Sequence, residues 1–268
     1  MGMAPDNPYH AIERPAPGTI GWRIDYHEAV SSTQDVAAKL AASGAGHGMV
    51  VIAETQSAGR GRMGRRWHSP PGANLYTTII LRPAIALGEA ARLGLVAGVA
   101  AAQALESVAP GIVALKWPND LWLNRKKAGG MIAEAVSDSE QRLACVLLGI
   151  GLNLNLGTDD LPVELRERAT SVLIETGRRC DRVALAAALF SALNNRYMEF
   201  EARGFEAVRP QWEHYSALTG MKVTVVNGDA RETGVVKGID SSGALMLDTA
   251  GGSRRILAGD VTLEGAYD

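Results

Sequence analysis

The sequence has little cysteine: Cys145 and Cys180 are the only two in 268 residues. Two cysteines are too few for the disulfide framework of a small secreted domain or for a cysteine-based zinc site. The five histidines show no spacing typical of metal ligands. Cys145 falls in an apolar run, so we expect it in the core. The sequence therefore predicts neither a disulfide scaffold nor a metal ion held by protein side chains.

A long hydrophobic run and a strong net charge are also missing. No stretch reaches the roughly 18 apolar residues that a membrane-spanning helix needs. The first 17 residues are polar and rich in proline, unlike the apolar centre of a signal peptide. The formal net charge is -2, so no global field attracts nucleic acid. Because the hydrophobic content is 47% and the charged content 21%, we expect a globular cytoplasmic enzyme with no membrane or DNA partner.

One stretch concentrates glycine and arginine: residues 56–67 read Q-S-A-G-R-G-R-M-G-R-R-W. An apolar run at 49–53 precedes it and a strand-like run at 75–81 follows, so we expect a loop between two strands. Glycine lets backbone N–H groups approach an anion closely. Arginine presents forked donors that match phosphate and carboxylate. This stretch, the Arg loop (residues 56–67), is therefore predicted to hold a phosphorylated ligand.

Other interpretations of the Arg loop exist. Gly59, Gly61 and Gly64 match the dinucleotide-binding fingerprint, but that motif needs a helix directly after the loop. Here a Ser-Pro-Pro-Gly segment at 69–72 and then a strand follow, so we reject it. A protein-kinase glycine loop does lie between strands, but no H-R-D or D-F-G motif follows. A merely solvated basic loop remains an alternative for this stretch alone.

The remaining pattern predicts one larger α+β domain followed by a small barrel. Strands are expected at 22–27, 112–115 and 143–156, and helices at 36–42 behind a Ser/Thr cap, 87–108, 181–203 and 205–215. A hairpin turn is expected at 124–126. From residue 218 onwards, five short alternating runs separated by turn residues predict a five-stranded barrel. We thus expect a loosely ordered tail over 1–20, a catalytic domain over 21–217 and the barrel over 218–268.

Two further segments place polar groups beside apolar strands. One is Lys-Trp-Pro-Asn-Asp at 116–120, and the other is Lys127 followed by Gly129 and Gly130. Each also has a plainer interpretation, because Pro-Asn-Asp is an ordinary turn formula and Lys127 adjoins two other basic residues in a hairpin. Together with the Arg loop they gather cations, amides and glycine-rich backbone, which favours a small ligand that bears phosphate.

These motifs resemble those of the biotin protein ligase family, in the same order and spacing. The matching stretches are residues 59–67, 116–120, 127–130 and Gly-Ile-Gly-Leu-Asn at 149–153. The resemblance runs from about Asp25 to the C-terminus. It implies a mixed β-sheet flanked by helices, of the class II synthetase-like type, with an SH3-like barrel at the C-terminus. It also implies the family's reaction, in which biotin and ATP form biotinyl-5′-AMP and pyrophosphate.

In the second step the family transfers biotin to one lysine of a biotin carboxyl carrier domain, so a carrier of an acyl-CoA or pyruvate carboxylase is the implied partner. Mg²⁺ is expected to help hold ATP and the leaving pyrophosphate. Some members carry an N-terminal helix-turn-helix domain. Only residues 1–20 precede the matching region here, so we expect the ligase-only type without DNA binding.

The resemblance also assigns roles to single residues. It implies biotin binding by Ser32, Thr33, Gln34, Gln56, Gly59, Arg60, Gly61, Arg62, Lys127 and Gly130. It implies ATP or adenylate binding by Arg62, Arg65, Trp67, Lys116, Asn119 and Asn153, with Asp120 in support. Gln34 departs from the family, where an asparagine is usual, and Met63 stands where some members have another arginine.

The expected chemistry needs cations more than a nucleophile. A carboxylate and a triphosphate must meet in the first step, and fixed positive charge has to cancel their repulsion. Lys127 and Arg62 are the predicted catalytic residues because they can supply that charge. The sequence does not identify a base for the acceptor lysine. Two rivals remain: a lipoate or octanoate ligase or transferase of related fold, and a non-catalytic binding module built on the barrel.

Overall fold

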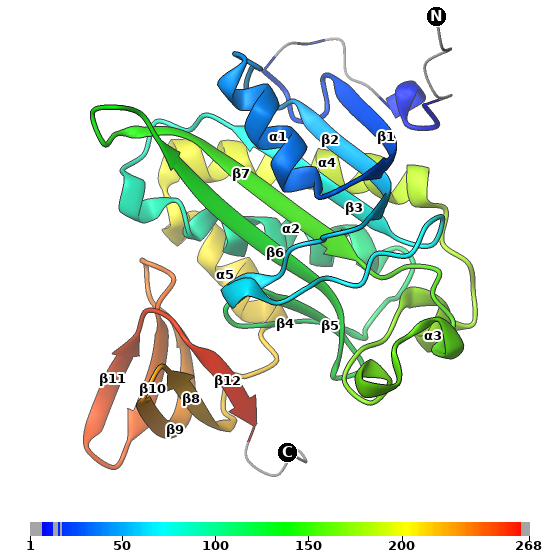
Figure 1. The fold of residues 1–268 in the computed structure, drawn as a ribbon. Coiled ribbons are helices and arrows are strands. Elements are labelled where there is room, and N and C mark those ends of the chain that lie inside the picture. Colours follow the sequence, from blue (N-terminus) through cyan, green and yellow to red (C-terminus); the bar gives the residue numbers. More distant parts are fainter. Residues whose placement is uncertain (1–6, 13–15, 17, 264–268) are drawn as a thin grey trace, which may run out of the picture.

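The computed structural model describes residues 7–12, 16 and 18–263. Its larger sheet has the order β1-β2-β3-β7-β6-β5-β4 (Figure 1). The β1–β2 pair is parallel and every other neighbouring pair is antiparallel, so the predicted mixed sheet is confirmed. Its strands are β1 (Ile24–Val30), β2 (Val50–Gln56), β3 (Leu75–Leu81), β4 (Val113–Lys116), β5 (Asp120–Leu123), β6 (Lys126–Ser137) and β7 (Leu143–Leu152).

Helices cover both faces of this sheet. α1 contacts β2, β3 and β7 on one face, whereas α2 contacts β4 to β7 on the other and packs against α4 and α5. Figure 1 shows α1 in front of the sheet and α2 and α4 behind it. The helices are α1 (Thr33–Ala42), α2 (Arg92–Glu106), α3 (Val172–Thr176), α4 (Arg182–Arg203) and α5 (Phe205–Tyr215), with 3-10 turns η1 (His10–Ile12), η2 (Arg62–Gly64), η3 (Leu87–Glu89), η4 (Thr158–Asp160) and η5 (Val163–Leu165).

The core follows from these two layers. α2 is rich in alanine, leucine and valine and is buried along most of its length. At Gly98 a Cβ atom would lie 3.1 Å from Met131 Cε and 3.4 Å from a methyl of Leu115, so the small residue lets the helix approach the sheet closely. Cys145 is buried in the smaller hydrophobic cluster between α1 and the sheet, which confirms its expected place in the core.

The C-terminal region forms a separate antiparallel sheet of the order β11-β10-β9-β8-β12, as the five alternating runs predict. Its strands are β8 (Lys222–Asn227), β9 (Ala230–Ile239), β10 (Leu245–Thr249), β11 (Gly252–Ile256) and β12 (Asp260–Leu263). Trp117 Nε1 donates to Gly243 O at 3.0 Å. A Cβ at Gly243 would lie 2.5 Å from Leu95 Cδ1. The small sheet therefore packs tightly against the segment that leads into the candidate site.

The N-terminal residues depart in part from expectation. Tyr9 and Ile20, both within the predicted loosely ordered tail, are buried in the main core. An aromatic and a branched apolar side chain recover free energy by leaving water, which anchors these two points of the segment. The rest of that prediction falls largely on residues 1–6, 13–15 and 17, outside the described residues. Among the described helices, none is both long and apolar enough to cross a membrane.

Candidate active site

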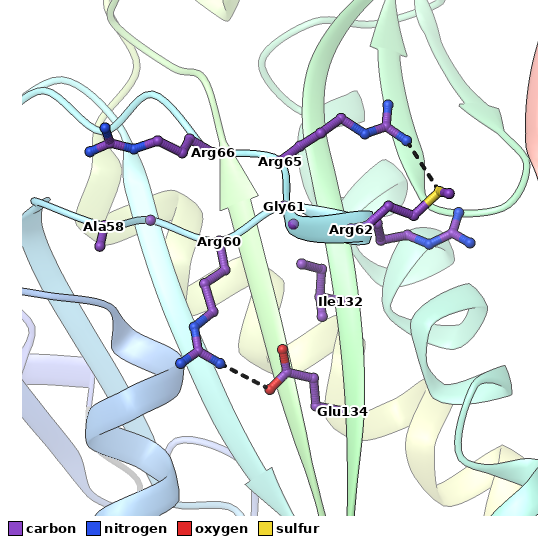
Figure 2. Close-up of a pocket in the computed structure, with 11 residues that line it drawn as sticks. Ala58, Arg60, Gly61, Arg62, Arg65, Arg66, Ile132 and Glu134 are labelled. Carbon is purple, nitrogen blue, oxygen red and sulfur yellow. Dashed lines mark hydrogen bonds and ion pairs between the residues drawn. The ribbon is translucent and has the colours of Figure 1, made fainter.

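The Arg loop follows β2 and crosses the face of the sheet above β6, where Ile132 and Glu134 lie beneath it (Figure 2). The loop folds back on itself, because Gly61 N–H donates to Arg65 O at 2.6 Å and Trp67 N–H to Gly59 O at 2.9 Å. A Cβ at Gly59 would lie 2.7 Å from Ser69 Oγ and 2.8 Å from Trp67 O. Glycine is thus required at position 59 for closure of the loop itself.

Two cavities adjoin the loop. The outer one, of about 720 Å³, is open and lined by residues 58–66 with Ile132 and Glu134. The inner one, the small pocket, has about 50 Å³ and lies between the loop, the start of α1 and the sheet. Ligand pockets usually measure about 300–1,000 Å³, so a drug-sized ligand must displace loop side chains to enter. The small pocket is lined by Ser32, Thr33, Gln34, Gln56, Arg60, Gly61, Arg62, Trp67, Tyr76, Thr77, Asn119, Lys127, Gly130, Ile132, Gly149, Ile150 and Gly151.

Hydrogen bonds organise the end of the small pocket near α1, which we call the amide end (Ser32, Thr33, Gln34 and Gln56). Ser32 is the N-cap of α1 and its Oγ accepts from Gln34 N–H at 3.2 Å. Gln56 Oε1 accepts from the backbone N–H of Thr33 at 2.9 Å and from its hydroxyl at 3.2 Å. Thr78 Oγ1 donates to Thr33 Oγ1 at 2.8 Å. Helix capping and pocket geometry therefore use the same side chains.

The opposite end, which we call the cationic end (Arg62, Asn119 and Lys127), brings positive charge to the pocket. Lys127 Nζ donates to Asp120 Oδ1 at 2.5 Å and lies 5.5 Å from the centre of the Trp67 ring. Arg62 donates to Asn119 Oδ1 at 3.0 Å. Burial lowers the pKa of the Arg62 guanidinium. Such a partly desolvated cation gains from an anionic ligand, because the anion favours its charged form.

Each arginine of the loop is anchored to a different partner. Arg60 forms an ion pair with Asp35 of α1 and another, at 3.8 Å, with Glu134 of β6 (Figure 2). Arg65 donates to both carboxylate oxygens of Asp260, at 2.6 and 2.7 Å. Asp260 begins β12, so the loop is tied to the C-terminal sheet. Arg66, the fourth, donates to Ser57 O at 2.6 Å.

Trp67 covers the floor of the site. A Cβ at Gly151 would lie 2.8 Å from its ring and one at Gly130 would lie 3.4 Å from it. The two glycines therefore leave room for the indole against the sheet. Trp67 Nε1 is buried without a hydrogen-bond partner.

Several predicted residues do not line the small pocket. Gly59 lies in the closely packed turn of the Arg loop against Ser69 and Trp67. Arg65 forms an ion pair with Asp260, and Asp120 forms one with Lys127. Lys116 lies with its Nζ 5.1 Å from the Trp122 ring centre, and burial lowers its pKa. Asn153 donates to Thr170 O at 3.0 Å and accepts from Asn74 at 3.4 Å, so its amide is engaged within the protein. The lining residues that sequence reasoning did not assign are Tyr76, Thr77, Ile132, Gly149, Ile150 and Gly151.

The comparison with known proteins agrees with this geometry. The Biotin/lipoate A/B protein ligase family matches residues 26–153, and the Biotin protein ligase C terminal domain matches residues 220–263. The bifunctional ligase/repressor BirA of Bacillus spizizenii is 37% identical, over 91% of this chain and 75% of its own. The biotin--[acetyl-CoA-carboxylase] ligase of Paracoccus denitrificans is 36% identical, over 87% of this chain and 98% of its own.

Among solved structures, biotin protein ligase from Aquifex aeolicus in complex with biotin and ATP has a TM-score of 0.77 and 28% identity, over 90% of this chain and 98% of that chain. The mixed sheet, the Arg loop and the second sheet define an enzyme of the biotin and lipoate ligase class. Since both sheets match and the identity reaches 37% over most of the chain, the chain belongs to the biotin protein ligase family. The resemblance drawn from the motifs is confirmed.

Proposed function

We propose that this chain is an AMP-forming biotin ligase. It joins biotin to ATP as biotinyl-5′-AMP with release of pyrophosphate, and then transfers biotin to a lysine of a carboxylase carrier domain. The observation that best supports this is the small pocket itself. A buried amide end and a cationic end face one cavity, so one ligand can place a polar ring at the first and an anion at the second.

In the first step a biotin carboxylate oxygen attacks the α-phosphorus and pyrophosphate leaves. Lys127 and Arg62 lie at the same end of the pocket, so they can neutralise both anions as they approach. Asp120 holds the ammonium of Lys127 in place. No acid or base is needed for this step, because the attacking carboxylate is already ionised at neutral pH.

In the second step the neutral amine of the acceptor lysine attacks the acyl carbon and AMP leaves. The cations that bind the phosphate stabilise the departing AMP. The acyl-adenylate hydrolyses readily, so the Arg loop is expected to exclude water while it waits for the acceptor. The roles given to single residues are part of this proposal.

Mg²⁺ is proposed as the companion of ATP. The carboxylates near the loop, Asp35, Glu134, Asp120 and Asp260, are each paired with a cation. Mg²⁺ characteristically keeps several waters and binds through substrate phosphates, which suits such a donor set. When bound it would supply charge neutralisation to the pyrophosphate.

An acyl-CoA or pyruvate carboxylase is the proposed source of the carrier domain, and the cytoplasm is the proposed compartment. The absence of DNA binding stays a prediction, which gel-shift titration with duplex DNA at low salt would test.

The decisive experiment is incubation of the purified chain with biotin, ATP, Mg²⁺ and a carboxylase carrier domain. Mass spectrometry should find one biotinyl group on one carrier lysine and AMP in solution. A carrier in which that lysine is replaced by arginine is the control. Modification by an octanoyl or lipoyl group instead, when those acids are offered in competition, would favour the related ligase. No pyrophosphate release with any acid would leave only a binding module.

A further inference from the structure

The two cavities beside the Arg loop share part of their wall. Arg60, Gly61, Arg62 and Ile132 line both of them. Arg62 belongs to the cationic end of the small pocket, where the proposed reaction takes place. The outer cavity, of about 720 Å³, is open to the surface. It therefore offers a route by which a nucleophile from outside the protein can reach the cationic end.

Glu134 is the one acid among the described residues that line these two cavities. The other charged side chains of the lining are the four arginines of the Arg loop and Lys127. Fixed cations repel an approaching ammonium, whereas a carboxylate among them attracts it. Glu134 is therefore the group on this route that a positively charged acceptor can bind.

The carboxylate of Glu134 is only loosely paired within the protein. Its Oε2 lies 3.8 Å from Nη1 of Arg60 (Figure 2), which is too far for a hydrogen bond. Arg60 has a closer ion pair with Asp35, and the Glu134 side chain makes no hydrogen bond to the described residues. Both of its oxygens can accept, and the side chain is 39% exposed. Glu134 can thus bind a cation without breaking a hydrogen bond.

Strand β6 directs Glu134 toward the Arg loop. Met131 faces α2, where a Cβ at Gly98 would lie 3.1 Å from its Cε, and successive side chains of a strand point to opposite faces. Ile132 and Glu134 therefore lie on the other face, beneath the loop (Figure 2). At a rise of about 3.4 Å per residue, Glu134 is about 14 Å along the strand from Gly130 at the small pocket. A lysine side chain has a flexible stem of four carbons, which can lie over the apolar Ile132 between them.

We propose that Glu134 binds the ammonium of the acceptor lysine as it enters, and so guides the lysine of the carrier domain to the adenylate. The ammonium pairs with Glu134 first, and the stem then extends over Ile132 until the nitrogen reaches the cationic end. The neutral amine is the form that reacts, and the cations at that end favour loss of the proton to solvent through the outer cavity. Glu134 therefore acts on binding of the acceptor and takes no part in the bond changes. The inference rests on the proposed function, because the acceptor must be a lysine.

The test separates binding of the acceptor from the two chemical steps. Wild type and Glu134→Gln are first loaded with biotinyl-5′-AMP and then mixed with rising concentrations of the carrier domain. The rate of biotin transfer gives the half-saturating carrier concentration and the maximal rate. In parallel, the loaded proteins react with hydroxylamine, a small nucleophile that is uncharged at mildly alkaline pH and needs no counterion.

Glu134→Gln should raise the half-saturating carrier concentration about 5-fold, the size expected for one partly exposed ion pair. The maximal transfer rate, the formation of the adenylate and the reaction with hydroxylamine should stay close to those of the wild type. Glu140→Gln is the matched control, because Glu140 is an exposed acid that pairs with Arg142 in the turn after β6. This variant should match the wild type in every measurement.

Asp35→Asn separates loss of the Glu134 carboxylate from release of Arg60. It removes the closer partner of Arg60 and leaves Glu134 in place, so the half-saturating carrier concentration should stay at the wild-type value. A rise equal to that of Glu134→Gln would overturn the proposal. An unchanged half-saturating concentration in Glu134→Gln, or a loss that is equally large with hydroxylamine, would do the same.

The outcomes also distinguish this inference from the proposed function. If the wild type forms biotinyl-5′-AMP and transfers biotin while Glu134→Gln uses the carrier equally well, only the role of Glu134 is lost. If the wild type forms no adenylate from biotin and ATP, the proposed function falls, and the role of Glu134 falls with it.

Discussion

The two ends of the small pocket are built differently. At the amide end, Ser32, Thr33 and Gln34 are each no more than 4% exposed and are fixed by hydrogen bonds to strands and to the α1 backbone. At the cationic end, Lys127 is held by an ion pair with Asp120, and the two side chains are 33% and 20% exposed. The Arg loop beside it is held by ion pairs of Arg60 and Arg65, whose side chains are 47% and 58% exposed. Buried hydrogen bonds are insensitive to salt, whereas exposed ion pairs are screened and individually weak.

Because of this difference, we expect the amide end to determine ligand affinity and the cationic end to promote the chemical step. The rigid amide end can select a ligand head before anything moves. We expect the Arg loop to open and close, because each of its exposed ion pairs contributes little stability. Substitutions at the first end should therefore change biotin binding, whereas substitutions at the second should change formation and retention of the adenylate.

The largest effect is expected at Lys127. Lys127→Ala removes a positioned positive charge from the pocket, so adenylate formation should fall by on the order of 10²-fold or more. Pyrophosphate release at saturating biotin and ATP measures it. Lys126→Ala, one residue earlier and exposed, is the matched control and should stay near wild type. Normal release by the Lys127 variant would show that the cationic end is not where chemistry is promoted.

A substitution at Arg62 tests whether the Arg loop retains the adenylate in the pocket. Arg62→Gly removes the bond to Asn119 and a cation from the pocket lining, so activated biotin should escape. Because a free acyl-adenylate reacts with exposed amines, the variant should label albumin present as a bystander, which a blot for biotin detects. Arg66→Gly is the control, since Arg66 belongs to the same loop but does not line the small pocket. Equal labelling by both variants would indicate general loosening of the loop.

A substitution at Gly151 tests whether the floor of the pocket needs a residue without a side chain beneath the Trp67 indole. A Cβ there would lie 2.8 Å from the Trp67 ring and 2.9 Å from its Nε1, so the indole would have to shift. Gly151→Ala should lower the free energy of unfolding by about 1–3 kcal/mol, as overpacking does, and weaken adenylate formation. Urea unfolding followed by circular dichroism measures the first effect. Gly157→Ala, whose nearest neighbour lies at 3.4 Å, is the control, and an equal loss there would contradict the steric explanation.

Local signals explain which parts of the fold were predictable. Asp181 caps α4 and α5 spans Phe205–Tyr215, as periodicity and capping indicate. The hairpin turn is confirmed by positive φ at Asn124 and Arg125. By contrast, nothing local indicates that β7 lies between β3 and β6, because strand pairing is set by tertiary packing. The elements η4, η5 and α3 have only three, three and five residues, so none of them is long enough to show a helical periodicity.

The site residues were likewise predictable where they lie in local sequence motifs and not where they are isolated in the sequence. Arg60, Arg62, Trp67 and Lys127 lie in compact motifs, and the fold brings them into one pocket. The acidic partners of Arg60 and Arg65 are Asp35, Glu134 and Asp260, which are isolated carboxylates on α1, β6 and β12. A single acid on a helix or a strand has no distinguishing sequence context, so only the tertiary structure reveals its partner.

The smallest effect is expected at Asp260, the link between the Arg loop and the C-terminal sheet. In the Arg65–Asp260 pair one guanidinium nitrogen contacts both carboxylate oxygens, and the side chains are about half exposed, at 58% and 48%. Solvent and salt screen such a pair, so Asp260→Asn should change the free energy of unfolding by no more than about 1 kcal/mol, and less at high salt.

Glu54→Gln is the informative comparison, since the Arg182–Glu54 pair is only 21% and 15% exposed. Removing Glu54 leaves a partly buried guanidinium uncompensated, for which a loss of up to about 3 kcal/mol is expected. Urea unfolding of both variants at low and high salt measures the contrast. A loss at Asp260 as large as that at Glu54, and independent of salt, would mean that the Arg loop is bound rigidly to the C-terminal sheet rather than held by weak, separable contacts.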